Sequence, residues 1–287
     1  MDIAVVGAGR VGTAVAVALR TAGHDVVAVS GGSATSARAA RFLPGVPVVA
    51  STEAARRASV VVLAVPDDAL PQVVSELAAD NAFRDAGWAV HVSGAATLEV
   101  LDPAAAAGTH RLGLHPLQTF PTAEDALERL RGAGIAVTSD DDEGEAFGCS
   151  LARDMGGVPF RLQDHARPLY HAAAVFASNY VVAVSAIAAD LFAAAGIEDP
   201  AAVMLPLQRA TLENIQRLGP GTALTGPAVR GELTTIDRNL VALRASKPEA
   251  VAPYVVLCRV AIQLGLDAGR LAPDEARAVE EALISWT

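Results

Sequence analysis

The sequence predicts an α/β domain built on a parallel sheet, residues 1–162, followed by an all-helical domain, residues 163–287. Three observations lead to this fold class. The chain opens with a short β-branched run, a glycine-rich turn and an alanine-rich helical pattern. Strand-then-helix units of this kind recur, and some of their strands are continuous apolar runs, as in parallel sheets covered on both faces. After Asp164 the strand-like runs end, and helical patterns separated by Gly and Pro follow.

Composition and charge limit the functions that this chain can have. Its 287 residues are 52% hydrophobic, with a formal net charge of -10 and no basic block, which argues against nucleic acid as a partner. No apolar run reaches membrane-spanning length without a polar interruption, and the first residues do not resemble a signal peptide. Cys149 and Cys258 lie far apart and lack metal-site spacing. We therefore expect a cytoplasmic protein without metal, membrane or nucleic-acid ligands.

The glycine-rich turn has the spacing G-x-G-x-x-G. Its six residues are Gly7, Ala8, Gly9, Arg10, Val11 and Gly12. Between a strand and a helix, this pattern is typical of dinucleotide binding. The first glycine permits a tight turn, the second lets the backbone approach a pyrophosphate, and the third lets the helix pack closely. The free N–H groups and the dipole at the helix N-terminus favour the anion. The sequence therefore predicts a Rossmann dinucleotide-binding domain.

The end of the second predicted strand, residues 26–29, indicates which dinucleotide is preferred. NAD-specific sites carry an acidic residue here that binds the ribose 2′-hydroxyl. This chain has Ser30 and Ser33 instead, followed by Arg38 and Arg41. Hydroxyls and a guanidinium suit a 2′-phosphate, which arginine can bind through two hydrogen bonds. We expect NADP(H) in preference to NAD(H), with Ser30, Ser33 and Arg38 as contacts; the alternative is a flexible turn before a solvated helix.

The ends of later strands supply further candidates. Strands are predicted at residues 46–49, 59–65, 89–93, 134–137 and 158–162. Ligands of doubly wound sheets lie beyond the carboxyl ends of the strands, so we expect Val65 and Pro66 to contact the cofactor. Ser93, at the end of the next strand, can hydrogen-bond the nicotinamide amide or a substrate. It can equally cap a helix that starts near Thr97.

The segment 110–120 is unusual for a structural strand because it carries His115, Gln118 and Thr119 between apolar residues and prolines. Its position on the ligand side of the sheet makes His115 a candidate acid and Gln118 a candidate substrate contact. A hydrogen-bonded structural histidine is the alternative interpretation.

The helical half begins with one predicted helix over residues 168–195, about 40 Å long. His171, Ser178 and Asn179 share one face of this otherwise apolar helix, so they need hydrogen-bond partners or a ligand. Further helices are predicted at residues 201–218, 234–245, 249–266 and 274–286. Thr225 and Arg230, in the loop 219–231, are candidate substrate contacts, although Gly and Pro there can simply separate helices.

Three strings of the sequence resemble a bacterial family that pairs a Rossmann-like domain with a helical domain of unassigned function. They are LHPLQTF at 114–120, YHAAAVFASN at 170–179 and LTGPAVRG at 224–231. That family belongs to the 6-phosphogluconate dehydrogenase-like reductases, which also include β-hydroxyacid dehydrogenases, ketopantoate reductases and pyrroline-5-carboxylate reductases. The resemblance covers the whole chain, and it implies a nicotinamide cofactor and a homodimer formed through the helical domain.

One departure from these relatives concerns the proton donor. β-Hydroxyacid dehydrogenases and ketopantoate reductases carry a lysine acid on the long helix, with an asparagine one turn later. Asn179 can match the asparagine, but Val175 stands one turn before it, and the single lysine of the chain is Lys247, between later helices. The catalytic lysine of those families therefore does not transfer to this chain.

The sequence predicts an NADP(H)-dependent oxidoreductase acting on a small polar carbonyl or hydroxy compound, such as a ketoacid. His171 is the first choice of proton donor, because an unperturbed histidine titrates near neutral pH. Ser178 and Asn179 would orient the substrate carbonyl, His115 is the competing acid, and Arg230 would bind a carboxylate. The alternatives are an imine reductase similar to pyrroline-carboxylate reductases, a deazaflavin-dependent reductase and a non-catalytic dinucleotide-binding regulator.

Overall fold

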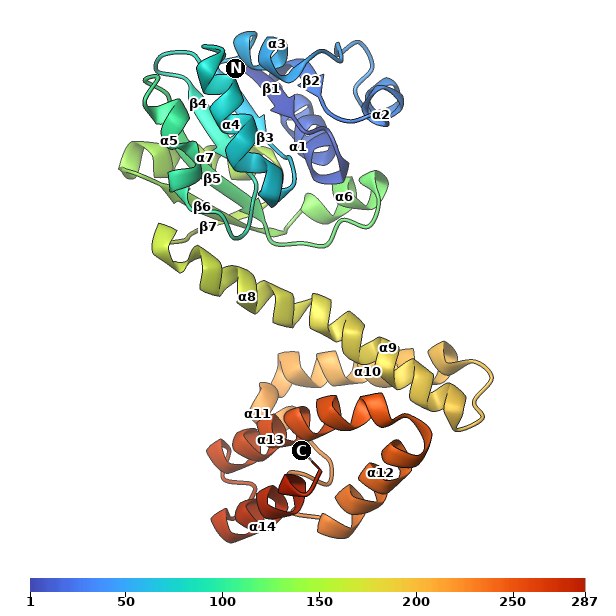
Figure 1. The fold of residues 1–287 in the computed structure, drawn as a ribbon. Coiled ribbons are helices and arrows are strands. Elements are labelled where there is room, and N and C mark those ends of the chain that lie inside the picture. The colour runs from blue at the N-terminus through green and yellow to red at the C-terminus, as the bar shows by residue number, and fades with distance from the viewer. Residues whose placement is uncertain (287) are drawn as a thin grey trace. The chain divides into compact units, whose positions relative to one another are not determined.

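The computed structural model describes residues 1–286, and the chain separates into two compact units at Asn179/Tyr180. We call them the sheet unit, up to Asn179, and the helical unit, from Tyr180 onward. In Figure 1 the sheet unit runs from blue to yellow-green, and the helical unit continues to red. The sequence pattern places the domain boundary after residue 162, whereas the compact units divide further along, so helix α8 (Arg167–Ala177) groups with the sheet.

The sheet unit is an α/β domain, which confirms the predicted fold class. Its strands are β1 (Asp2–Val6), β2 (Asp25–Ser30), β3 (Val60–Leu63), β4 (Trp88–His91), β5 (His110–Pro116), β6 (Gly134–Ser139) and β7 (Val158–Arg161). They form one sheet in the order β2-β1-β3-β4-β5-β6-β7, in which β5 and β6 are antiparallel and all other neighbours parallel. The remaining helices of the unit are α1 (Arg10–Thr21), α2 (Thr35–Phe42), α3 (Ser51–Arg56), α4 (Leu70–Ala79), α5 (Asp102–Ala105), α6 (Ala123–Leu130) and α7 (Asp142–Asp154).

The core of the sheet unit explains the continuous apolar runs. Alternate residues of a strand point to opposite faces of the sheet. In β3, Val60 and Val62 pack with Leu19 of α1 on one face, whereas Val61 and Leu63 belong to the cluster on the other face, which contains residues of α4. Both faces of β3 are therefore covered, and every residue of the strand is buried.

Two predicted elements were wrong. Residues 46–49 form no strand: a single bridge joins Val48 to Val29, because Pro47 lacks the N–H that a ladder needs. The predicted helix over residues 168–195 is interrupted at Ser178, whose φ of -129° and ψ of -68° are not helical. Serine and asparagine side chains compete for backbone hydrogen bonds, so the Ser178-Asn179 pair is a weak point of the helix.

The helical unit contains the remaining helices. They are α9 (Asn179–Ala194, whose first residue belongs to the sheet unit), α10 (Pro200–Leu218), α11 (Pro220–Ala223), α12 (Leu233–Ser246), α13 (Val251–Asp267) and α14 (Pro273–Ile284). Apart from the short α11 and the start of α9, these match the predicted helices to within a few residues. Their core joins Leu240 of α12, Val255 of α13 and Val279 of α14, with Ile187 and Leu191 of α9 packed against it.

Within residues 1–286, two helical stretches are apolar and long enough to cross a membrane. One is Asp164–Ala194, whose most apolar window is not buried, and the other is Pro248–Asp267, whose window is 33% buried. Core helices of soluble proteins meet the same criterion, and Val255, Cys258 and Ile262 of the second stretch lie in the core of the helical unit. The first stretch includes the polar side chains that the sequence singled out.

Candidate functional site

The glycine turn after β1 contains two glycines that the fold itself requires. Gly7 has a φ of 96°, and a Cβ there would lie 2.6 Å from the carbonyl carbon of Ala64. A Cβ at Gly12 would overlap the carbonyl oxygen of Gly7. Tight turning and close helix packing therefore explain both residues without any ligand.

Gly9 differs from these two glycines. Its φ is -75°, and the nearest atom outside its neighbours, the oxygen of Gly7, would lie 3.9 Å from an added Cβ. The space beside Gly9 is thus open, at the position where α1 begins without a side-chain cap or an acidic residue in its first turn. An open approach next to uncapped N–H groups suits a bound anion.

On the β2 side, the structure brings Arg38 to the glycine turn. Its Nη1 donates to the carbonyl oxygen of Ala8 at 3.4 Å, which leaves the rest of the guanidinium for other partners. Ser33 is exposed in the loop between β2 and α2. The hydroxyl of Ser30, in contrast, is buried and hydrogen-bonded to that of Ser51 at 3.1 Å. Of the three predicted contacts, Ser33 and Arg38 are therefore the accessible ones.

On the β3 side, half-buried Val65 and exposed Pro66 follow Ala64, the residue that packs against Gly7. At the end of β4, the hydroxyl of Ser93 accepts the backbone N–H groups of Ala95 and Ala96, at 3.2 and 3.0 Å. The Ser93 side chain thus stabilises the turn that follows it.

Beyond β4 and β5, two of the predicted histidines come together. His115, in β5, and His171, in α8, have ring centroids 6.5 Å apart in an edge arrangement. Gly94 lies between them: a Cβ there would be 2.6 Å from His171 Nδ1 and 3.0 Å from His115 Nε2. His115 Nδ1 is 2.8 Å from the hydroxyl oxygen of Tyr170. We call His115, Tyr170 and His171 the strand-end cluster.

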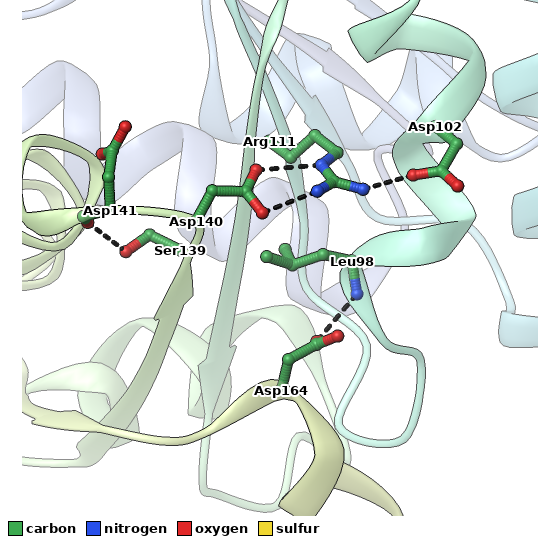
Figure 2. Close-up of polar contacts among 7 residues, drawn as sticks. All are labelled: Leu98, Asp102, Arg111, Ser139, Asp140, Asp141 and Asp164. Carbon is green, nitrogen blue, oxygen red and sulfur yellow. Dashed lines mark hydrogen bonds and ion pairs between the residues drawn. The ribbon is translucent and has the colours of Figure 1, made fainter.

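A buried arginine supports this cluster. Arg167, the first residue of α8, is fully buried and donates to the carbonyl oxygens of Ser93 and Ala96 and to Thr138 Oγ1. Just before it, Asp164 accepts the N–H of Leu98 at 2.8 Å, as Figure 2 shows. These contacts fix the start of α8 to the segment after β4.

A second arginine holds the strand that carries His115. Arg111 of β5 donates through Nε and Nη2 to the carboxylate of Asp140, at 2.9 and 2.6 Å, and through Nη1 to Asp102 (Figure 2). The hydrogen bonds to Asp140 are the main reason why the pKa of Arg111 is raised. Since Asp140 follows β6 and Asp102 begins α5, Arg111 links β5 to both elements.

Burial favours the uncharged forms of the ionisable side chains in and beside the strand-end cluster. It lowers the pKa of His115 to about 4, and the positive charge of Arg167 and the neighbouring His171 act in the same direction. Burial also lowers the pKa of His91, at the end of β4, to about 3, again assisted by Arg167 and by His115. The pKa of Tyr170 is raised to about 12 by burial, which Arg167 partly opposes. At neutral pH His91 and His115 are therefore uncharged.

Among the other candidates in the sheet unit, Ser178, Asn179 and Gln118 make no hydrogen bond or ring contact with this cluster within residues 1–286. Ser178 and Asn179 lie about 10 Å further along the helix from His171. Gln118 is exposed, and its side-chain oxygen accepts the N–H of Thr119 at 2.8 Å. Sequence reasoning missed Tyr170 and Arg167, although Tyr170 directly precedes His171 in one of the three family-like strings.

Thr225 and Arg230 belong to the helical unit, where both are exposed. The guanidinium of Arg230 already pairs with the carboxylate of Glu232, at 2.6 and 3.2 Å. Within residues 1–286, no group of three or more His, Cys, Asp or Glu side chains is placed to hold a metal ion.

Two family models match successive parts of the chain, and the second match begins within the sheet unit. Residues 1–116 match the family of Rossmann-like domains, and residues 133–261 match a domain of unknown function, DUF2520. No protein of curated function matches the sequence. Among solved structures, a Bacteroides fragilis protein provisionally named an NADP oxidoreductase is 26% identical, with a TM-score of 0.75, covering 91% of this chain and 98% of its own.

Two further structures share the fold at lower identity. A protein of Thermotoga maritima is 21% identical with a TM-score of 0.68, covering 92% of this chain and 98% of its own. An imine reductase from a Pseudomonas species is 20% identical with a TM-score of 0.65, covering 98% and 99% of the two chains. The chain thus has the fold of these structures, with a Rossmann-like domain at its N-terminus.

Proposed function

We propose that this protein is an NADP(H)-dependent oxidoreductase acting on a small polar carbonyl or hydroxy compound, such as a ketoacid. The observation that carries the proposal is Gly9. The fold explains Gly7 and Gly12, but the space beside Gly9 is open in the chain itself and lies at the uncapped start of α1. A pyrophosphate approaching the backbone accounts for a glycine at this position. The name of the Bacteroides fragilis relative supports the same class of cofactor.

The order of the strands supports a direction for the dinucleotide. Arg38 stands on the β2 side of the glycine turn, where an adenosine 2′-phosphate would meet it. The nicotinamide end would then extend over β3 toward β4 and β5. At a spacing of about 4.8 Å per strand, β4 lies about 10 Å and β5 about 14 Å from β1. Ser93 follows β4, and His115 of the strand-end cluster lies near the end of β5.

When bound, the cofactor supplies or accepts a hydride. The chain's own residues must then bind the substrate, exclude water and move one proton at the substrate heteroatom. The strand-end cluster contains two imidazoles and a phenol, the kinds of group that carry out such proton transfers. A second candidate function is reduction of a cyclic imine, which the similarity to the Pseudomonas imine reductase favours.

An Arg38→Ala variant tests the cofactor assignment. We expect NADPH affinity to fall by about tenfold to a hundredfold, because a hydrogen-bonded charge partner of the 2′-phosphate is lost. The affinity for NADH, which lacks that phosphate, should stay within twofold of the wild type. Fluorescence titrations of both nucleotides measure this difference.

Arg41→Ala is the matched control, since Arg41 lies one turn further along α2 and pairs on the surface with Glu124. It should bind both nucleotides as the wild type does. Failure of the wild type to bind either nucleotide would contradict the proposal, and the deazaflavin-dependent and regulatory alternatives would then come first. Tight NADPH binding without turnover of 2-oxoacids or cyclic imines would favour a non-catalytic regulator.

We also propose that the protein is a homodimer formed through its helical unit. The support is the apolar surface of α9 and α10, where Val182 is 68% and Leu207 62% exposed. Several large apolar side chains exposed on neighbouring elements are typical of interaction sites. Further exposed apolar side chains on the two helices are Val181, Val184, Val203, Leu205 and Leu212.

Light scattering after size exclusion should give twice the chain mass of 29.3 kDa. A Val182→Asp/Leu207→Asp variant should give the single-chain mass, because a carboxylate cannot be buried in an apolar contact without a partner. Val158→Asp, at a 59% exposed valine of β7, is the matched control and should remain dimeric. A monomeric wild type that co-sediments with phosphatidylcholine vesicles would instead indicate membrane attachment.

A further inference from the structure

We propose that Tyr170 is the catalytic acid of this site and gives its hydroxyl proton to the substrate heteroatom, while His115 is the positioning residue that holds the phenol. This inference rests on the proposed function and names the proton donor of the same site. Two contacts fix the Tyr170 side chain. Its hydroxyl lies 2.8 Å from His115 Nδ1, with the rings edge-on at 5.5 Å between centroids, and Phe160 of β7 packs at 6.0 Å.

The tautomer of His115 decides whether the phenol can act as a donor. A neutral imidazole carries one N–H, on either Nδ1 or Nε2. With the proton on Nδ1, His115 donates to the Tyr170 oxygen and leaves the phenol hydrogen free for a substrate. With the proton on Nε2, Nδ1 instead accepts the phenol hydrogen, and Tyr170 then has no free proton to give. Both tautomers keep the hydrogen bond between Nδ1 and the Tyr170 hydroxyl, and a phenol that donates to a substrate requires the first.

The charge formed by proton transfer is stabilised in the same place. After giving up its proton, Tyr170 is a phenolate that accepts the Nδ1–H of His115. The positive charge of Arg167 favours this anion and opposes the effect of burial on the pKa of Tyr170. Arg167 also favours the neutral form of His115. A fixed donor and a buried cation are the groups that stabilise a developing anion in a water-poor site.

His171 is less suited to the same task. A histidine acts as an acid in its imidazolium form, in which both ring nitrogens carry hydrogen. His171 Nδ1 is buried beside Gly94, and no residue in the described part of the chain accepts a hydrogen bond from it. Protonation would therefore leave a buried N–H without an acceptor, which is unfavourable. Proton donation by the Tyr170 hydroxyl leaves no buried N–H without an acceptor.

In the reducing direction, hydride from the dihydronicotinamide forms a C–H bond at the carbonyl or imine carbon, and the π electron pair moves to the oxygen or nitrogen. That atom takes the proton of the Tyr170 hydroxyl. The phenolate is protonated again by water after the product leaves, since Tyr170 is only half-buried.

A Tyr170→Phe variant tests the step, with NADPH and either pyruvate or 1-pyrroline as probes. It removes one oxygen and keeps the ring between His115 and Phe160. We expect kcat to fall by about 10²–10⁴-fold, the usual contribution of a general acid, with NADPH affinity unchanged. Tyr254→Phe is the matched control, because it removes a hydroxyl that is hydrogen-bonded to Asn239 at 3.0 Å within the helical unit, and it should retain activity.

Two outcomes would overturn the assignment: a Tyr170→Phe variant with kcat within threefold of the wild type, or a larger loss in His171→Asn than in Tyr170→Phe. Absence of turnover by the wild type would count against the proposed function instead. The assignment of the proton donor would then be tested by a measurement that needs no substrate.

That readout is the tautomer of His115, observed by nitrogen NMR of histidine-labelled protein. Between pH 6 and 8 we expect the signal of a neutral histidine protonated at Nδ1. This signal is assigned to His115 by its absence in a His115→Gln variant, and it should shift in Tyr170→Phe. If the signal shows protonation at Nε2, the phenol hydrogen is already used by His115 and Tyr170 cannot be the donor.

Discussion

A Gly9→Ala variant is expected to fold as the wild type does and to bind NADPH about a hundredfold more weakly. The first part follows from the backbone, because a φ of -75° suits any residue and the nearest contact of the new methyl group is 3.9 Å away. The second follows from the pyrophosphate that the open space would receive, since a methyl group there holds the phosphate away from the N–H groups of α1. A hundredfold loss corresponds to about 2.7 kcal/mol.

Thermal unfolding and NADPH titration on the same preparation separate the two effects. Gly12→Ala is the contrasting variant: its methyl group would overlap the carbonyl oxygen of Gly7, so we expect lost stability as well as lost binding. If Gly9→Ala binds NADPH with wild-type affinity, the open space does not hold the pyrophosphate, and the main argument for the cofactor is lost.

The sequence was sufficient for features that depend on local periodicity. Continuous apolar runs predicted the buried strands, and the glycine spacing located the turn, because both signals arise from residues that are close in sequence. The break at Ser178 and the missing strand at 46–49 were local as well, but each depended on one residue, a weak helix former in one case and Pro47 in the other. One residue contributes little to a periodic pattern that is formed by all its neighbours, so the pattern alone did not reveal these two interruptions.

The polar contacts of the site were harder to predict, because they join distant parts of the chain. Arg167 donates to the carbonyl oxygen of Ser93, 74 positions earlier, and Tyr170 meets His115, 55 positions earlier. A sequence marks a histidine as a candidate acid from its chemistry alone, so His115 and His171 were found. The sequence does not show which hydroxyl lies beside an imidazole. Only the folded chain distinguishes Tyr170, which contacts His115, from Ser30 and Ser178.

Acid is expected to destabilise the sheet unit through His91. This side chain is fully buried, and neither of its ring nitrogens has a hydrogen-bond partner among residues 1–286. Its pKa is lowered to about 3 in the folded protein, chiefly by burial, whereas the unfolded chain takes up the proton near pH 6.5. Below pH 6.5 the unfolded state therefore binds more protons than the folded state, and the unfolding free energy falls as the pH is lowered toward 3.

Between pH 6.5 and 4.5 this effect amounts to about 2 kcal/mol for His91, and His115 contributes in the same direction. Urea unfolding followed by the fluorescence of Trp88, in a Trp286→Phe background, reports on the sheet unit alone. In a His91→Leu variant the decline should be smaller by that amount, with little loss at pH 7.5, because two unpaired nitrogens are replaced by apolar atoms. His165→Leu, at an exposed position, should keep the wild-type profile. An unchanged decline in His91→Leu would mean that other groups take up the protons.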